Sequence, residues 1–315
     1  MLSSTPTPLI PCSDLARACG VKNVFLKMEN CQVTGSFKDR GMQTLCEDIK
    51  NKGGVGICCS SGGNAGLAAA WCCLQCGLEA DVFVPSTTTD TIVTRLKSYG
   101  ATVHVCGDEW KTADDAARLF CKENNRDYVS PFDDGRLWDG HASLVDELTH
   151  QMSQVPDVIA FSVGGGGLAA GIITGLNRSE WSPSIVLCET ELAGSMNAAL
   201  IAGEPVSIGP IKSIATSLGA PLVSKGAFEL LQSYQGKVHS QLVSDAAAVE
   251  GCLYLANQQR VLVEPACGAT LAGFRAWVSN MPVDGREDMT IVLIICGGSG
   301  ISLDLLNKYR MAESG

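Results

Sequence analysis

Three short apolar runs in this chain each end in a glycine-rich loop, and this pattern constrains the fold more than any other feature. The loops cover residues 60–66, 164–167 and 296–300 and follow runs that read as strands. Stretches with helical character lie between the strands, so strands and helices alternate along most of the chain. Such alternation predicts an α/β fold with open, mostly parallel twisted sheets flanked by helices.

The expected elements follow from the apolar runs and from the turn-forming residues between them. We expect strands at 24–28, 55–59, 80–84, 102–106, 158–163, 184–188 and 290–295. We expect helices at 39–50, 67–76, 89–99, 114–124, 141–154, 225–234 and 244–259, and another from the tetraglycine to about 176. The loop at 131–135 is typical of a boundary between lobes, and 315 residues suffice for two lobes.

Charge and hydropathy exclude several classes of function. The 33 acidic residues outnumber the 23 lysines and arginines, and the net charge of −10 disfavours nucleic acid or an anionic membrane as partner. No apolar run reaches the length of about 18 residues that a membrane span needs. The first twenty residues also lack the basic and apolar segments of a signal peptide, so we expect a cytoplasmic protein.

The 15 cysteines are predicted to be free thiols. Many lie inside apolar runs, as Cys58 and Cys188 do, where cysteine behaves as a small hydrophobic residue. Their odd number and the missing signal peptide favour a reducing compartment over a disulfide framework. Cys73 and Cys76 form a CxxC pair, but no second pair completes a zinc site, so zinc is disfavoured.

Lys38 lies between a Gly-Ser turn and the helix expected from Asp39. Ser36 is predicted to cap this helix, with Asp39 as the acidic half of a capping box. A lysine in the first helical turn opposes the helix dipole, which favours anions there. Lys38 is therefore either an ordinary surface lysine or an amine beside an anion site, able to form a Schiff base with an aldehyde cofactor.

The tetraglycine at 164–167 is the strongest indication of a ligand. Four glycines between a strand and a helix let backbone N–H groups approach a phosphate, and the helix start adds partial positive charge. An ordinary tight turn needs only one or two glycines. Neither the dinucleotide fingerprint nor the P-loop lysine is present, which disfavours nicotinamide-dependent oxidoreduction.

The loop at 60–66 can bind a carboxylate through its hydroxyl groups and its backbone N–H groups. Asn64 adds a neutral amide that can donate to an anionic oxygen. The alternative interpretation is an ordinary turn, because runs of serine, glycine and asparagine commonly form one.

These motifs occur in the order found in pyridoxal-phosphate enzymes of fold type II, the tryptophan-synthase-β-like fold. The chain resembles most closely the liver-type L-serine dehydratase/L-threonine deaminase group, over nearly its whole length and including residues 131–134 and 140–143. The resemblance implies a small domain at 36–132 and a large domain made of 1–35 and 133–315. It also implies pyridoxal 5′-phosphate between them and a homodimer.

The resemblance also implies the roles of single residues. Lys38 would bind the cofactor covalently, Phe37 would pack on its ring, and Cys296 would face its ring nitrogen. Ser217 stands where the family has a small apolar residue against the ring. The phosphate would lie on the loop of Gly164, Gly165, Gly166, Gly167 and Leu168. The carboxylate of an amino-acid substrate would be surrounded by Ser61, Gly62, Asn64 and Ala65, and Asn64 would also bind the ring oxygen.

A monovalent cation such as potassium is implied at Glu189, Ala193, Leu218 and Ala220. The alternative interpretation of Glu189 is a solvated residue at a strand end. The implied activity is dehydration and deamination of L-serine to pyruvate and ammonia, and of L-threonine to 2-oxobutyrate. Three alternatives stay open: a racemase, a β-replacement synthase, and a weakly active protein that senses amino acids. Ala65 disfavours the racemase, because serine racemases place a proton-donating hydroxyl there.

Overall fold

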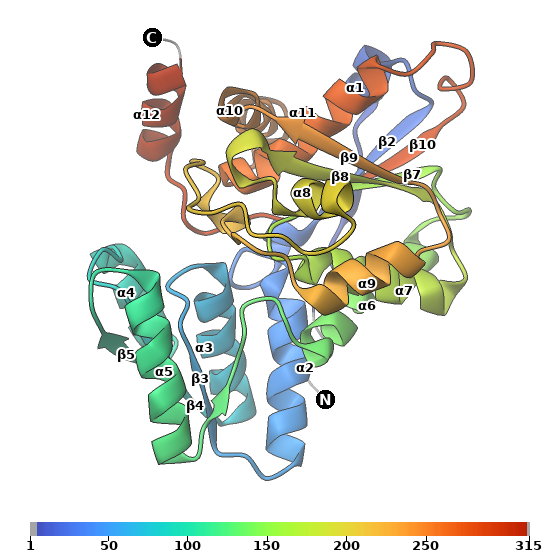
Figure 1. Cartoon of the computed structure of the whole chain (residues 1–315). Coiled ribbons are helices and arrows are strands. Elements are labelled where there is room, and N and C mark those ends of the chain that lie inside the picture. The colour runs from blue at the N-terminus through green and yellow to red at the C-terminus, as the bar shows by residue number, and fades with distance from the viewer. Residues whose placement is uncertain (1–4, 314–315) are drawn as a thin grey trace.

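The computed structural model describes residues 5–313, which form two lobes, each built on its own sheet (Figure 1). The larger sheet contains, in spatial order, β1 (Leu9–Pro11), β2 (Asn23–Met28), β10 (Thr290–Ile295), β7 (Val158–Ser162), β8 (Ser184–Thr190) and β9 (Val238–Val243). The smaller contains β5 (Thr102–Val105), β4 (Glu79–Val84), β3 (Gly56–Cys59) and β6 (Asp127–Tyr128). Among the strands of the described residues, β1 alone runs antiparallel to its neighbour, which confirms the predicted α/β class.

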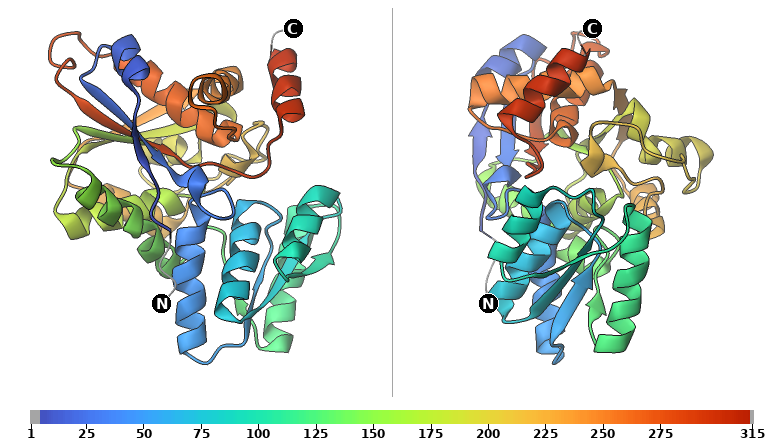
Figure 2. Two further views of the ribbon diagram at one scale, coloured as in Figure 1. Left: turned by 180° about the vertical axis from the view of Figure 1, so that it is seen from behind. Right: turned by 90° about the vertical axis from the view of Figure 1, so that its left-hand side faces the viewer.

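Helices cover both faces of the larger sheet (Figure 1). One face carries α6 (Gly135–Gln151), α7 (Gly167–Ser179) and α9 (Lys225–Ser233), and the other carries α1 (Ser13–Cys19), α10 (Asp245–Tyr254) and α11 (Pro265–Ser279). The smaller lobe contains α2 (Lys38–Asn51), α3 (Asn64–Cys76), α4 (Asp90–Ser98) and α5 (Trp110–Asn124). The views in Figure 2 show the smaller lobe below the larger one, with α12 (Leu303–Glu313) at one side.

The inner strands of the larger sheet are buried on both faces, as their continuous apolar sequences require. Phe161 on β7 and Leu293 on β10 have no exposed surface, and Phe274 of α11 packs in the same core. A separate apolar core in the smaller lobe contains Leu45 of α2 and Leu67 of α3. The three glycine-rich loops follow the carboxyl ends of β3, β7 and β10, where parallel sheets place their ligands.

A buried ionic cluster connects β2 to helices α2 and α6. Lys27 donates to Glu147 at 2.5 Å, and Arg40 donates to Glu29 and to Glu147 at 2.6 Å each. Lys27 and Arg40 are almost completely buried, so the mutual pairing of these charges offsets their loss of hydration. Arg40 is two residues from Lys38, so the cluster also fixes the first turn of α2.

Most expected elements lie within a few residues of their predicted positions, and the differences have local causes. Helix α6 begins at Gly135 rather than at 141, because the Asp134 carboxylate accepts the backbone N–H of Arg136 and caps it. The sequence does not predict β9, an edge strand whose sequence VHSQLV is half polar. Nor does it predict the short elements β1, β6 and α1, the mostly apolar α8 (Ser195–Ala202), the 15-residue helix α11, or α12.

The cysteines behave as the sequence predicts. All fifteen are free thiols, and most are buried in the apolar cores. The CxxC pair lies in the last turn of α3, where the Cys73 sulfur is 3.7 Å from that of Cys46. A separate observation concerns membranes: within residues 5–313, no helix combines the length and apolarity needed to cross a bilayer.

Candidate active site

Lys38 is the first residue of α2, and α2 begins beside the loop that follows β10. The backbone N–H of Phe37 donates to the Cys296 carbonyl at 3.4 Å, and Ser36 forms a bridge with Gly297. The amine of Lys38 donates to the backbone carbonyl of Pro131. The loop after β10 and the loop before α6 therefore meet at the start of α2.

The predicted capping box at this helix is wrong. The Asp39 carboxylate accepts the backbone N–H of Thr34 at 2.8 Å and also the Thr34 hydroxyl. The Ser36 hydroxyl is buried and has no hydrogen-bond partner within residues 5–313. The reason is the turn at Gly35, whose φ of 93° brings Thr34 rather than Ser36 against Asp39. Asp39 thus closes the Gly-Ser turn that precedes Lys38.

The surroundings of Lys38 favour a neutral amine. Burial lowers the pKa of Lys38 to about 8, and a smaller opposing effect comes from the charge of Cys296. The amine also lies 5.1 Å from the centre of the Phe37 ring. An amine with this pKa is partly unprotonated near neutral pH, as a nucleophile or a general base must be.

The tetraglycine forms a close-fitting cradle before α7. Gly166 adopts a φ of 95°. A Cβ atom on Gly165 would overlap the ring of Phe132, and one on Gly167 would lie 2.8 Å from the Phe132 carbonyl. Gly164 is similarly close to Leu218. Only glycines allow this approach, and the cradle opens onto the N-terminus of α7, which includes Leu168, so the loop fits a phosphate group.

The loop after β3 is equally compact. A Cβ atom on Gly66 would overlap the Ser61 carbonyl, and one on Gly62 would lie 3.1 Å from Thr88. The Ser61 hydroxyl accepts the backbone N–H of Gly63 at 3.3 Å. Ala65 is buried in the first turn of α3. The loop therefore directs helix-start N–H groups to a position that suits a carboxylate.

Asn64 occupies the centre of a hydrogen-bonded cluster that the sequence does not predict. Its side-chain nitrogen donates to both carboxylate oxygens of Glu264, at 3.1 and 3.2 Å, and its side-chain oxygen accepts the N–H of Ser299 at 2.8 Å. The Ser217 hydroxyl also donates to Glu264. The sequence indicates no role for Glu264, although it is the only charged residue in the mostly apolar stretch 261–274.

Cys296 lies at the end of β10 in an almost fully buried position. Its sulfur is 3.5 Å from the hydroxyl of Ser162. A hydrogen bond from the thiol of Cys267 lowers the pKa of Cys296, although burial acts in the opposite direction. Cys296 therefore offers a weakly polar sulfur rather than a carboxylate.

Glu189 is completely buried at the carboxyl end of β8. Its carboxylate oxygens accept the backbone N–H groups of Met196 and Asn197, at 2.8 and 2.7 Å, in the first turn of α8. Burial raises the pKa of Glu189 to about 7, and these two hydrogen bonds only partly oppose the effect. Ala193 and Leu218 belong to one buried apolar cluster, and Ala220 is buried nearby in sequence. The alternative of a solvated Glu189 is therefore wrong.

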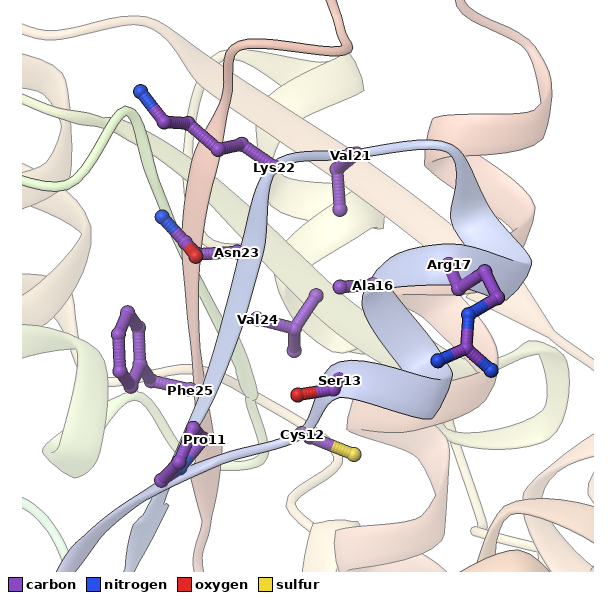
Figure 3. A pocket seen from close by; sticks show the side chains of 10 residues that line it. All are labelled: Pro11, Cys12, Ser13, Ala16, Arg17, Val21, Lys22, Asn23, Val24 and Phe25. Atoms are coloured by element: carbon purple, nitrogen blue, oxygen red, sulfur yellow. The ribbon is translucent and has the colours of Figure 1, made fainter.

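Two of the surface cavities bear on this assignment. Figure 3 shows one of about 250 Å³ between α1 and β2, and no predicted site residue lines it. The other measures about 380 Å³ and is lined by Arg95, Arg260 and Ser299 among others. It adjoins the Asn64 cluster through Ser299 but does not include Lys38. The residues predicted to bind the cofactor and the substrate lie instead on or beside the loops after β3, β7 and β10, whereas Glu189 lies on β8.

Comparison with known proteins agrees with this geometry. Residues 1–297 match the family described as pyridoxal-phosphate dependent enzyme. A human serine dehydratase-like protein is 40% identical over 94% of this chain and 91% of its own length. The human L-serine dehydratase/L-threonine deaminase is 40% identical over 98% of this chain and 97% of its own length. The crystal structure of a fungal L-serine ammonia-lyase from Rhizomucor miehei superposes with a TM-score of 0.91, at 33% identity and 98% coverage of both chains.

Proposed function

Since this chain belongs to the family of pyridoxal-phosphate dependent enzymes, we propose that it converts L-serine to pyruvate and ammonia. L-Threonine would give 2-oxobutyrate by the same elimination. Relatives named L-serine dehydratase/L-threonine deaminase and L-serine ammonia-lyase support this substrate class. The observation that carries the proposal is the amine of Lys38, held by Pro131 where the loop before α6 meets the loop after β10.

The residues present fit the cofactor. We assign the phosphate to the loop Gly164–Gly167 with Leu168, because the cradle that Phe132 closes has no room for a side chain. We assign the ring to the space between Phe37 and Ser217, with Cys296 toward the ring nitrogen and Asn64 toward the ring oxygen. When bound, pyridoxal phosphate supplies an electron sink for the negative charge that develops at the substrate Cα.

The protein then has to bind the amino acid and move one proton. Ser61, Gly62, Asn64 and Ala65 would surround the substrate carboxylate at the start of α3. The neutral amine of Lys38 would take the proton from Cα, and the pKa of about 8 makes that amine available. Pro131 orients the amine through its carbonyl.

Two residues favour elimination over the competing reactions. Ala65 has no proton to return to Cα from the face opposite Lys38, so the substrate is not racemised. Cys296 stabilises a charge on the ring nitrogen less than a carboxylate would, which disfavours transamination. Together they favour loss of the β-hydroxyl group.

We further propose a potassium ion at Glu189, with backbone carbonyls of Ala193, Leu218 and Ala220 as additional ligands. Support comes from the buried Glu189 carboxylate, which has no lysine or arginine partner within residues 5–313. The homodimer, the cytoplasmic location and the domain boundaries near residues 36 and 132 are part of the same proposal.

The test is a coupled assay on the purified protein supplied with pyridoxal phosphate. Pyruvate formation from L-serine is followed with lactate dehydrogenase, and the visible spectrum reports cofactor binding. Lys38→Ala should abolish both, whereas Lys50→Ala, at the exposed end of α2, should retain both. Cofactor binding with D-serine as the product would indicate the racemase. Binding without any turnover would indicate a sensor.

A further inference from the structure

The Glu264 carboxylate is buried between the two lobes. It is only 7% exposed, and it directly precedes α11. Its carboxylate accepts the Asn64 amide, the Ser217 hydroxyl and the backbone N–H of Gly300, the last at 2.6 Å. Within residues 5–313 its hydrogen-bond partners are neutral groups. A buried carboxylate held in this way keeps a fixed orientation, because each lost donor would leave charge unsatisfied.

This carboxylate and the backbone N–H of Ser299 together determine which way the Asn64 amide points. The amide oxygen accepts the Ser299 N–H at 2.8 Å, and the amide nitrogen faces Glu264. A flipped amide would place its oxygen against the carboxylate and its nitrogen against another N–H donor. Both contacts would be repulsive, so Asn64 is held as a hydrogen-bond donor on this side.

Ser217 reinforces that arrangement. Its hydroxyl hydrogen is used by Glu264, so its oxygen can only accept toward Asn64, whose nitrogen is 3.4 Å away. A single N–H of Asn64 can serve both oxygens of Glu264, at 3.1 and 3.2 Å, which leaves the second N–H with only this long contact. That second N–H can donate to a better acceptor. The backbone of Ser217 also lies against Gly164 of the phosphate cradle.

We propose that Glu264 and Ser217 are positioning residues that hold the second N–H of Asn64 toward the ring oxygen of pyridoxal phosphate. This inference rests on the proposed function, in which Asn64 faces that oxygen. A donor with a fixed orientation stabilises the ionised ring oxygen over the neutral hydroxyl form. The same cluster joins Asn64 of the smaller lobe to Ser217 and Glu264 of the larger lobe.

Glu264→Gln tests the proposal, because it retains the shape but removes the charge that fixes the amide. We expect cofactor binding about tenfold weaker, the loss typical of one hydrogen bond to a charged group. We also expect the absorption band of the ionised ring oxygen to give way to that of the neutral form at neutral pH. Glu250→Gln, on the exposed side of α10, is the matched control and should leave both readouts unchanged.

Ser217→Ala provides a second test in case Glu264→Gln does not fold. It should weaken cofactor binding by a few-fold and shift the spectral titration in the same direction, and Ser217→Thr should restore both by returning a hydroxyl. Ser207→Ala, in the exposed loop that precedes Ser217, is its control. Dissociation constants come from fluorescence titration of apoprotein, and the spectral titration is run on holoenzyme.

Two results would be incompatible with the proposal. Normal cofactor affinity and a normal spectrum in Glu264→Gln, with lower thermal stability alone, would make the cluster a simple contact between the lobes. The same holds if Ser217→Ala changes stability but not the spectrum. Failure of the proposed function looks different, because the unmodified protein would then show neither the cofactor band nor pyruvate.

Discussion

The ring of Phe37 meets the ring of His141 edge to face, with centroids 4.9 Å apart and planes inclined by 65°. His141 belongs to α6, and it packs so closely on α2 that a Cβ atom on Gly41 would lie 2.5 Å from its ring. Both of its ring nitrogens are buried without a hydrogen-bond partner in the described part of the chain. Burial, reinforced by the charges of Lys38 and Arg40, holds the pKa of His141 well below its usual range.

His141 should therefore make the protein less stable in mild acid. The unfolded chain takes up a proton at this residue below about pH 6.5, whereas the folded protein does not. This group alone should lower the free energy of unfolding by up to about 1.4 kcal/mol for each unit by which the pH is lowered. His141→Leu should remove that part of the slope in urea unfolding between pH 7.5 and 5.5, and the exposed His150→Gln should not. Equal slopes in all three proteins would contradict the prediction.

Lys38 should capture the cofactor with a pH dependence set by its own pKa. Only the neutral amine attacks an aldehyde, so the rate should rise through pH 8 and level off above it. Mixing apoprotein with pyridoxal phosphate between pH 6.5 and 10 and following the visible absorbance measures this rate. Lys38→Ala is the blank. A rate that keeps rising toward pH 10 would mean that Lys38 behaves as an ordinary exposed lysine.

Gly165→Ala should weaken cofactor binding at the phosphate loop. The new methyl group would overlap the ring of Phe132, so the loop or the ring must move, and cofactor affinity should fall at least about tenfold. Gly135→Ala is the control, because a Cβ atom there meets nothing within 4 Å. Adding Phe132→Leu to Gly165→Ala should recover part of the affinity, measured by fluorescence titration. Unchanged affinity in Gly165→Ala would exclude this loop as the phosphate site.

Potassium should stabilise the protein mainly at alkaline pH, through Glu189. Its pKa of about 7 lies above the value of about 4.3 in an unfolded chain, so the folded state holds the proton longer. In cation-free buffer the free energy of unfolding should therefore fall as the pH rises from 5 toward 8. A bound cation offsets this cost, because it pairs with the ionised carboxylate.

Thermal unfolding in potassium chloride and in choline chloride of equal ionic strength measures the effect. We expect a higher melting temperature with potassium at pH 8 and little difference at pH 5.5. Glu189→Gln should abolish the difference and Glu250→Gln should retain it. A potassium effect that survives in Glu189→Gln would locate the cation elsewhere.

Local sequence was sufficient for the elements whose information lies within a few residues. The strand β10 is a continuous apolar run. The four consecutive glycines at 164–167 indicate a loop whose backbone approaches a ligand closely. Helix α6 shows the limit, because its start depends on a cap at Asp134 that the apolar pattern alone does not reveal. The edge strand β9 is half polar and becomes a strand only because β8 offers it hydrogen-bonding partners.

What the sequence by itself determined is the α/β class, the three glycine-rich loops and the lysine at a helix start. Each follows from hydrophobic periodicity or from the backbone freedom of glycine, which are local properties of the chain. Only the tertiary structure decided that Glu264 holds Asn64, two hundred residues earlier, and that Asp39 turns to Thr34 instead of Ser36. The first contact depends on how the lobes pack, because neighbours distant in the chain bury the charge and set the direction of the hydrogen bond. The second depends on the backbone turn at Gly35, which the sequence pattern alone does not reveal.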